Sequence, residues 1–559
     1  MSASLGAIID GYLELRLLLD PVRGTALGRH TDDGRYARYD AESVREALAA
    51  LRSYTGSLEE AEADTLDDEI DRTAALHAAR HDVLVLERER PHEHDPSFHL
   101  SHLLNGVYLL LARPSHAPAR QAEALLSRLR ELPGFLKTAA EVIRAPRRPC
   151  VELARAQLPA ARALVRDAPD DPGLDLHTLD AAELREARDG ALAALDAFDA
   201  FLLERAEATP PDGTAPSPAR DAPSRAGRRG SRDRAASGAG DGIGRELFDR
   251  KLHTAHLIRE NADELARYGE RLRADAEARL TRCAAEVTPG AHWRDVLDTL
   301  RADAPRGQDA LAAFSGAAQR ASAFVRDHAL VSAPPADATV EATPSFLRPL
   351  IPIAAYEMPA VLAPESFAGA MYVTPPPPDA SGALCHAELP LVALHEGSPG
   401  HHLHLSRTAA LARPARRMLI SPIAAEGWAL YCEELMMETG FLETPAQRFF
   451  QAYFLLWRAV RVLLDVGLHA RAMPVAEAER TLRDALGLDE RTAHAEALRY
   501  AAHPTYQLCY AVGRRDILQL RDDARRAQGD GFVLRDFHDA LLAYGALPTP
   551  LARWGMGLA

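Results

Sequence analysis

The segment 391–404 constrains this chain more than any other stretch. An apolar run ends in a His-Glu pair at 395–396, and two adjacent histidines follow at 401–402. In the zinc peptidase pattern H-E-x-x-H, two histidines four residues apart share one helix face and bind zinc, and the Glu is the general base. Here Pro399 occupies the position of the second histidine and cannot bind a metal. The second ligand must therefore come from elsewhere.

The spacing of the histidines requires an interrupted helix if both are to bind one ion. An unbroken helix would place His402 near the face of His395 but about 10.5 Å further along the axis. Bonds of about 2.1 Å from a single zinc ion cannot bridge that gap, and His401 would lie on another face. Ser398-Pro399-Gly400 favours a break, because Pro removes a backbone donor and Gly tolerates unusual backbone angles. The alternative is a helix that ends at Ser398, with surface histidines after it.

A further carboxylate lies downstream in the stretch 421–435. Ser421 is a favourable N-cap, and Pro422 suits the first helical turn. Glu426 falls on the second turn of this otherwise apolar helix, where a buried carboxylate needs a partner or a metal. Two histidines, an adjacent Glu and a later helical Glu supply the ligands and the base of a His₂Glu catalytic zinc site.

These motifs carry a resemblance to a known family. H-E-x-x-P-G-H-H at 395–402 and E-G-W-A-L-Y at 426–431 resemble the bacterial domain of unknown function 885, which is grouped with the gluzincin-type zinc metallopeptidases. Weaker matches lie outside them: Asp20-Pro21, Leu27-Gly28-Arg29-His30, Tyr356 with Pro359, Asp465-Val466-Gly467-Leu468-His469, the irregular 504–513 segment and Gly545-Ala546-Leu547-Pro548. Val466 and Thr505-Tyr506 depart from the family pattern.

The resemblance implies a mainly α, multi-helical metallopeptidase-like fold with a small β-sheet and a deep central cleft. We expect one Zn²⁺, held by His395, Glu426 and one of His401 or His402. We favour His401, because the smaller insertion needs the smaller distortion. Glu396 would deprotonate a water molecule whose pKa the zinc has lowered, and later protonate the leaving amine. His402 would hydrogen-bond the substrate or a ligand carboxylate.

Candidate substrate contacts come from the segment 503–514. Tyr506, Tyr510 and Arg514 share a face if this segment is helical. We expect Tyr510 to stabilise the oxyanion, as a Tyr or His from a later helix commonly does in zinc peptidases. The alternative is a core tyrosine with a satisfied hydroxyl. Arg514 is a candidate for bidentate contact with a substrate carboxylate, and Tyr506 is a further substrate-binding candidate.

Three more polar residues share one face of a predicted helix over 446–472. Arg461, Asp465 and His469 are spaced at i, i+4 and i+8. They are candidates for support behind the metal ligands, and Asp465 is a candidate to orient a metal-binding histidine through its free N–H. The alternative is a buried ion network between helices.

The domain organisation follows from changes in composition. Residues 1–208 read as an N-terminal helical part, and 245–559 as the catalytic part, with one continuous catalytic unit formed by both. Residues 209–244 are rich in Pro, Gly, Ser, Ala and Arg, which predicts a disordered linker or loop. A long helix is expected over 246–280. Ala370–Val373 is expected to be a short edge strand beside the catalytic helix that holds an extended substrate.

The net charge and the cysteines argue against two classes of partner and favour one cellular compartment. The net charge of −15 over 559 residues argues against nucleic-acid binding and against attraction to anionic membranes. The five cysteines are far apart and odd in number, which fits a reduced, cytoplasmic chain. Neither a signal peptide nor an apolar run long enough to span a bilayer is recognised. The oligomeric state stays open.

Three functions remain after these arguments. The first is a zinc-dependent hydrolase acting on a peptide or a related amide, including small-molecule amides. The second is a metallopeptidase-fold protein repurposed as a biosynthetic or tailoring enzyme, or as a non-hydrolytic binding scaffold. The third is a helical interaction module, which predicts no bound metal. The presence of candidates for every ligand and for the base favours the first.

Overall fold

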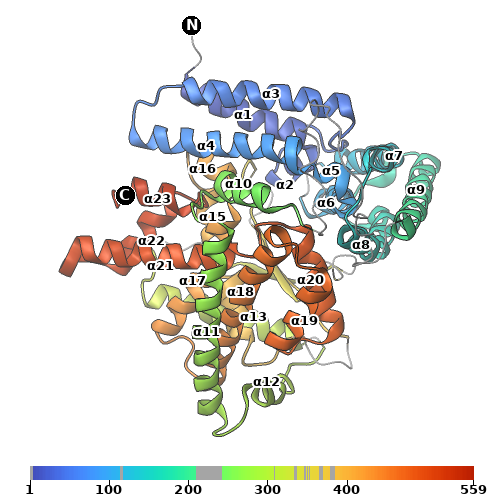
Figure 1. Cartoon of the computed structure of the whole chain (residues 1–559). Helices are drawn as coiled ribbons and strands as arrows, with labels where there is room; N and C mark the ends of the chain where they lie inside the picture. The colour runs from blue at the N-terminus through green and yellow to red at the C-terminus, as the bar shows by residue number, and fades with distance from the viewer. Residues whose placement is uncertain are drawn as a thin grey trace, which may run out of the picture.

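A computed structural model describes residues 4–113, 117–208, 242–307, 309–332, 336–344, 348, 351, 353–363, 369–377 and 384–558. Most of the expected linker 209–244 lies outside these ranges. The described chain is mainly helical with one small sheet, as predicted (Figure 1).

The N-terminal helices form a layer at the top of Figure 1. These helices are α1 (Leu5–Leu19), α2 (Pro21–Leu27), α3 (Ala41–Glu60) and α4 (Leu66–Leu84). Buried apolar side chains of α1, α3 and α4 share a core with Ala415, Leu419, Leu547 and Leu551 from the C-terminal part. The layer is therefore packed onto the C-terminal part of the chain.

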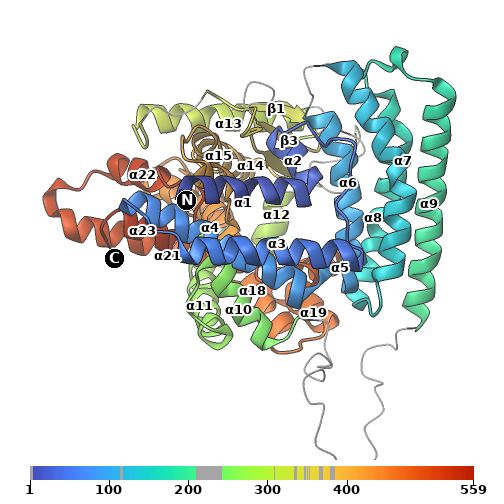
Figure 2. The same cartoon turned by 90° about the horizontal axis from the view of Figure 1, so that it is seen from above.

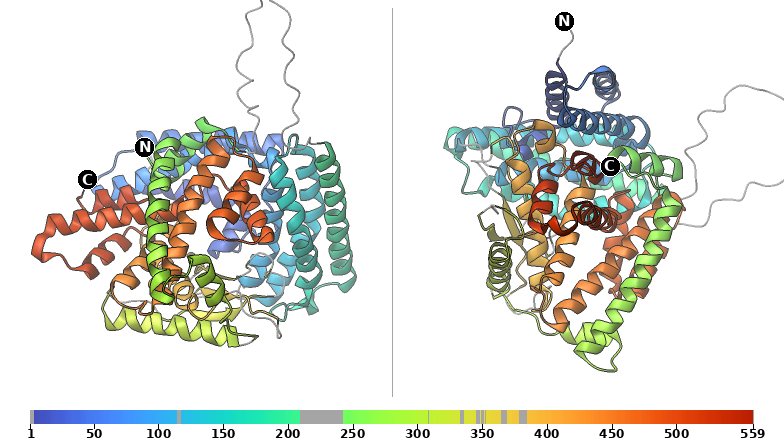
Figure 3. Two further views of the ribbon diagram at one scale, coloured as in Figure 1. Left: turned by 60° about the horizontal axis from the view of Figure 1, so that its bottom comes forward. Right: turned by 90° about the vertical axis from the view of Figure 1, so that its left-hand side faces the viewer.

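The next helices form a bundle that stands on the right in Figure 2. They are α5 (Pro91–His94), α6 (Pro96–Ala112), α7 (Pro118–Val142), α8 (Arg148–Asp167) and α9 (Ala181–Ala208). Leucines and alanines from α6 to α9 form the core of this bundle. The bundle lies beside the C-terminal helices (Figure 3), where α8 packs against α20 (Glu490–Ala502).

The prediction of one continuous helix over 246–280 is wrong. It consists of α10 (Arg245–His256) and α11 (Ala262–Val287). Leu257 adopts a left-handed conformation with φ 54° and ends α10. Asn261 then starts α11 through a capping box with Glu264. Two further helices, α12 (Trp293–Arg301) and α13 (Asp309–Asp327), lead to the sheet.

The C-terminal part contains the helices that carry the candidate site. They are α14 (Leu389–Glu396), α15 (His401–Ala409), α16 (Pro414–Met418), α17 (Pro422–Glu438), α18 (Pro445–Ala470), α19 (Val475–Leu486), α20, α21 (Cys509–Gln528), α22 (Leu534–Leu542) and α23 (Thr549–Gly555). Helices α17 and α21 approach closely at two glycines: a Cβ on Gly427 would lie 2.5 Å from Gly513 Cα. Side chains at the start of α21 are thereby brought against Glu426.

The sheet corrects one prediction. The strands are β1 (Thr339–Ala342), β2 (Ala354–Glu357) and β3 (Ala370–Val373), in the order β1-β3-β2. Strand β3 was expected at an edge but is central: it pairs in parallel with β1 and antiparallel with β2. Its four residues are all buried, and Met371 and Val373 pack against side chains of α13 and α14. The strand that packs against α14 is instead the edge strand β2.

Two further observations bear on the sequence-based expectations. All five cysteines are buried thiols. Among the described residues, every helix is too short or too polar to cross a membrane.

Candidate functional site

The break between α14 and α15 is confirmed. Helix α14 ends at Glu396 and α15 begins at His401, with the Ser398-Pro399 peptide bond in cis. Gly400 sits against the end of α14, where its N–H donates to the carbonyl of Leu394 at 3.0 Å. A Cβ at Gly400 would lie 2.0 Å from the carbonyl oxygen of His395. Only glycine fits there, and this lets α15 start at the C-terminal end of α14.

The break brings three predicted ligands together. His395, His401 and Glu426 each offer one ligand atom, and these atoms lie within 4.8 Å of one another. Glu426 Oε2 is 3.3 Å from His401 Nε2 and 3.9 Å from His395 Nε2. A tetrahedral zinc ion with bonds of about 2.1 Å needs donor atoms about 3.4 Å apart. The donor types and their spacing therefore fit one zinc-like ion.

The charges in this cluster favour a cation at its centre. Burial raises the pKa of Glu426, but hydrogen bonding to His401 and the charges of both histidines outweigh it and lower the pKa to about 2. Burial lowers the pKa of His401, but Glu426 beside it raises that pKa above its ordinary value. Without a metal, the Glu426 carboxylate thus favours the protonated form of His401. A bound ion would supply that positive charge instead.

Glu433 is a functional candidate that the sequence analysis missed. Its Oε1 lies 2.7 Å from His395 Nδ1, so that N–H donates to the carboxylate and Nε2 keeps its lone pair on the side of Glu426. Carboxylates commonly orient metal-binding histidines in this way. Glu433 follows Glu426 by seven residues, two turns along the same face of α17. The seven-residue spacing of two carboxylates on an apolar helix was the sequence signal that could have identified Glu433.

Glu396 lies where the cluster meets the sheet. Its Oε2 accepts the backbone N–H of Tyr356, on the edge strand β2, at 2.9 Å. The residue is partly exposed, whereas His395 beside it is buried. The predicted base is thus anchored through one carboxylate oxygen next to a predicted ligand.

Tyr506 and Tyr510 both lie at the cluster. Tyr506 OH donates to Glu426 Oε1 at 2.5 Å. The Tyr510 ring packs edge-on against the Tyr506 ring, with centroids 6.1 Å apart. The guanidinium groups of Arg458 and Arg461 lie 5.5 Å and 5.1 Å from the Tyr510 ring centroid.

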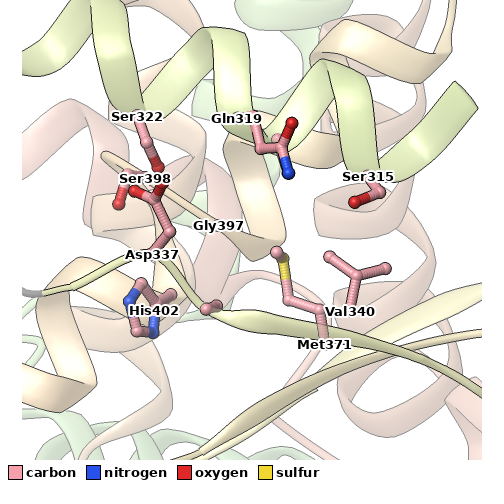
Figure 4. Close-up of a pocket in the computed structure, with 11 residues that line it drawn as sticks. Ser315, Gln319, Ser322, Asp337, Val340, Met371, Gly397, Ser398 and His402 are labelled. Atoms are coloured by element: carbon pink, nitrogen blue, oxygen red, sulfur yellow. The ribbon is translucent and has the colours of Figure 1, made fainter. Parts of the chain in front are cut away.

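His402 and Arg514 have other partners. His402 Nε2 donates to the Ala336 carbonyl at 2.7 Å, and Nδ1 accepts from Tyr356 OH at 3.1 Å. This ring lines a separate cavity of about 40 Å³ between α13, the sheet and the 397–400 turn (Figure 4). Arg514 Nε donates to Glu434 at 3.0 Å. Its charge is therefore paired within the protein.

The residues Arg461, Asp465 and His469 hold the segment that carries the tyrosines. Asp465 accepts the backbone N–H groups of Thr505 at 2.9 Å and Leu508 at 3.1 Å. His469 donates to the Tyr500 carbonyl, and Arg461 donates to the Tyr500 hydroxyl and to Glu496. Asp465 therefore orients a turn beside Tyr506, while the carboxylate on His395 belongs to Glu433.

The comparisons with known proteins concern family and fold. Residues 21–556 match the family described as "Bacterial protein of unknown function (DUF885)", and the chain belongs to this family. Similar solved structures include a protein from Shewanella oneidensis described as a lipoprotein of unknown function, with 19% identity, a TM-score of 0.76, and coverage of 99% of this chain and 100% of that chain. Another is a protein from Colwellia psychrerythraea described as a lipoprotein, with 17% identity, a TM-score of 0.79, and coverage of 100% and 99%. These likenesses show a shared fold. No curated protein matches the sequence.

Proposed function

We propose that this member of the DUF885 family is a zinc-dependent hydrolase that cleaves a peptide or a related amide bond, with a gluzincin-like arrangement around a central cleft. The observation that carries the proposal is the convergence of His395, His401 and Glu426, from three separate helices, beside the carboxylate of Glu396. A zinc ion held by these three residues would lower the pKa of a water molecule and polarise the substrate carbonyl.

The protein's own groups account for the proton transfers. Glu396, anchored at Oε2 by Tyr356 N, takes a proton from the attacking water with its other oxygen and passes it to the leaving amine. Tyr510 donates to the developing oxyanion. Burial and the charge of Glu426 raise the pKa of Tyr510, so the phenol keeps the proton that it must donate.

The edge strand β2 offers a place for the substrate backbone. Its outer side, beside Glu396, can pair with an extended chain, as in recognition by strand addition. We also retain as proposals a cytoplasmic location and the absence of nucleic-acid and membrane partners. The names of the two similar structures describe lipoproteins, so fractionation of the native cells is the direct check of location.

The experiment that tests the hydrolase is a Glu396→Gln substitution assayed on a peptide library. Loss of the general base is expected to reduce turnover about 10²- to 10⁴-fold, while zinc content stays the same. His402→Gln is the matched control, because its ring faces Ala336 and Tyr356. Zinc-loaded protein whose activity is unchanged by Glu396→Gln would contradict the mechanism and favour a tailoring enzyme or binding scaffold.

A further inference from the structure

Arg458 on α18 is the unusual charged residue near the candidate zinc site. Its side chain is only 13% exposed. Its Nε is buried and has no hydrogen-bond partner among the described residues. Its Nη2 lies 3.9 Å from Glu433 Oε1, which is too far for a hydrogen bond. A buried guanidinium usually has its donors satisfied, because leaving them unpaired costs free energy.

The neighbouring arginines differ from Arg458 in this respect. Arg461, one turn further along the same helix, donates to Tyr500 and Glu496. Arg514 is paired with Glu434. Of these three arginines, only Arg458 has a buried N–H donor without a hydrogen-bond partner among the described residues, although the Glu433 carboxylate lies 3.9 Å from its Nη2.

Arg458 lies close to the candidate ligands and to Tyr510. One carboxylate, that of Glu433, separates its guanidinium from the imidazole of His395. The guanidinium also lies 5.0 Å from the ring centroid of Phe454 and 5.5 Å from that of Tyr510. Aromatic rings of this kind hold an arginine in place while its N–H edge stays available for a planar anion.

We propose that Arg458 binds a carboxylate of the substrate, so that the enzyme selects substrates with an anionic group close to the scissile bond. Bidentate pairing with a carboxylate satisfies the fork of N–H donors. This inference rests on the proposed function for its placement relative to zinc. The carboxylate can be the C-terminal group of a peptide or an acidic side chain, because both present the same chemistry.

The test compares two small ligands by calorimetry on the zinc-loaded protein. Succinate carries two carboxylates, and succinamate replaces one of them with an amide. We expect succinate to bind about 10- to 100-fold more tightly, and we expect Arg458→Met to abolish that difference. Arg458→Lys, which keeps the charge but not the fork, should retain part of it. Arg448→Met, at a half-buried position on the same helix where the arginine pairs with Glu286, is the matched control.

The source of the carboxylate is resolved with peptides bound to the Glu396→Gln variant. An N-acetylated tripeptide with a free C-terminus is compared with its C-terminal amide, and an amidated Asp tripeptide with its Asn counterpart. A preference in either pair that Arg458→Met removes supports the proposal and names the source. The proposal would be overturned if folded Arg458→Met and the wild type showed the same ratio of affinities within each peptide pair. If the protein fails to take up zinc, the proposed hydrolase is wrong, and the succinate comparison on metal-free protein still decides the role of Arg458.

Discussion

Glu433 Oε1 lies 2.7 Å from His395 Nδ1, and this contact fixes which nitrogen of His395 faces Glu426. Glu433 is 1% exposed and its Oε2 has no hydrogen-bond partner among the described residues. A buried carboxylate held in this way is best explained by the histidine that it orients.

Glu433→Gln is therefore expected to weaken zinc binding. The amide can still accept from Nδ1–H but no longer supplies the negative charge that makes His395 a better ligand. We expect a loss of affinity of about 10- to 100-fold, measured by competition with a chromophoric chelator. Glu438→Gln, on the same helix but paired with Arg521, is the control. Equal affinities for Glu433→Gln and wild type would show that Glu433 does not support the metal.

Tyr506→Phe tests the hydroxyl that contacts Glu426. Its loss removes the donor to Glu426 Oε1 and leaves that oxygen free to turn. We expect zinc affinity to fall about 10-fold, with the fold retained. Tyr453→Phe, which removes a buried hydroxyl bonded to the Leu486 carbonyl, should leave zinc affinity unchanged. The same loss in both variants would point to a general loss of stability.

Gly400→Ala tests the turn between the histidines. The added methyl group meets the His395 carbonyl at 2.0 Å, so the end of α14 or the start of α15 must move. We expect a lower melting temperature and a substoichiometric zinc content. Gly56→Ala, inside α3 with open space around it, should be neutral or slightly stabilising. A Gly400→Ala protein that melts and binds zinc like wild type would contradict the tight turn.

The raised pKa of Asp465 predicts that the stability of the protein depends on pH. Burial raises the pKa of Asp465 to about 7, against smaller lowering effects of the Thr505 and Leu508 N–H groups. Between pH 4 and 7 the folded protein thus keeps a proton that the unfolded chain has lost, so this group's stabilising contribution falls as pH rises. Relative to Asp465→Asn, the wild-type free energy of unfolding should drop by up to about 4 kcal/mol across that window.

The measurement for Asp465 is denaturant unfolding from pH 4 to pH 8, with a chelator present so that zinc occupancy stays constant. The difference between wild type and Asp465→Asn should level off above pH 7. A difference that stays flat across the range, or that grows in favour of wild type as pH rises, would contradict the assigned pKa.

Local sequence signals predicted the parts of the site that depend on local structure. Pro399 and Gly400 indicated the helix break, and the break is what allows His401 to approach His395. Glu426 was identified because a carboxylate on an apolar helix needs a partner. The helical class followed from the family resemblance, and the strand at 370–373 from its residues.

The parts of the fold and of the site that could not be predicted depend on contacts between segments distant in the sequence. Arg514 looked available until Glu434, eighty positions earlier, was found beside it. His402 was close in sequence to the ligands, but the Ala336 carbonyl and Tyr356 draw its ring away. The order of three short strands, which places β3 in the centre, also leaves no local signal. Asp465 shared a face with Arg461 and His469 as expected, yet its partners are the N–H groups of a turn forty residues later.

The most direct test of the central claim is the metal content of the purified protein, determined by plasma mass spectrometry for wild type, His395→Ala, Glu426→Ala and His402→Ala. The proposed zinc site requires close to one zinc per chain in wild type and in His402→Ala, and a large loss in the other two variants. Wild-type protein that stays metal-free after incubation with zinc would contradict the proposed site and leave a helical binding protein as the better explanation.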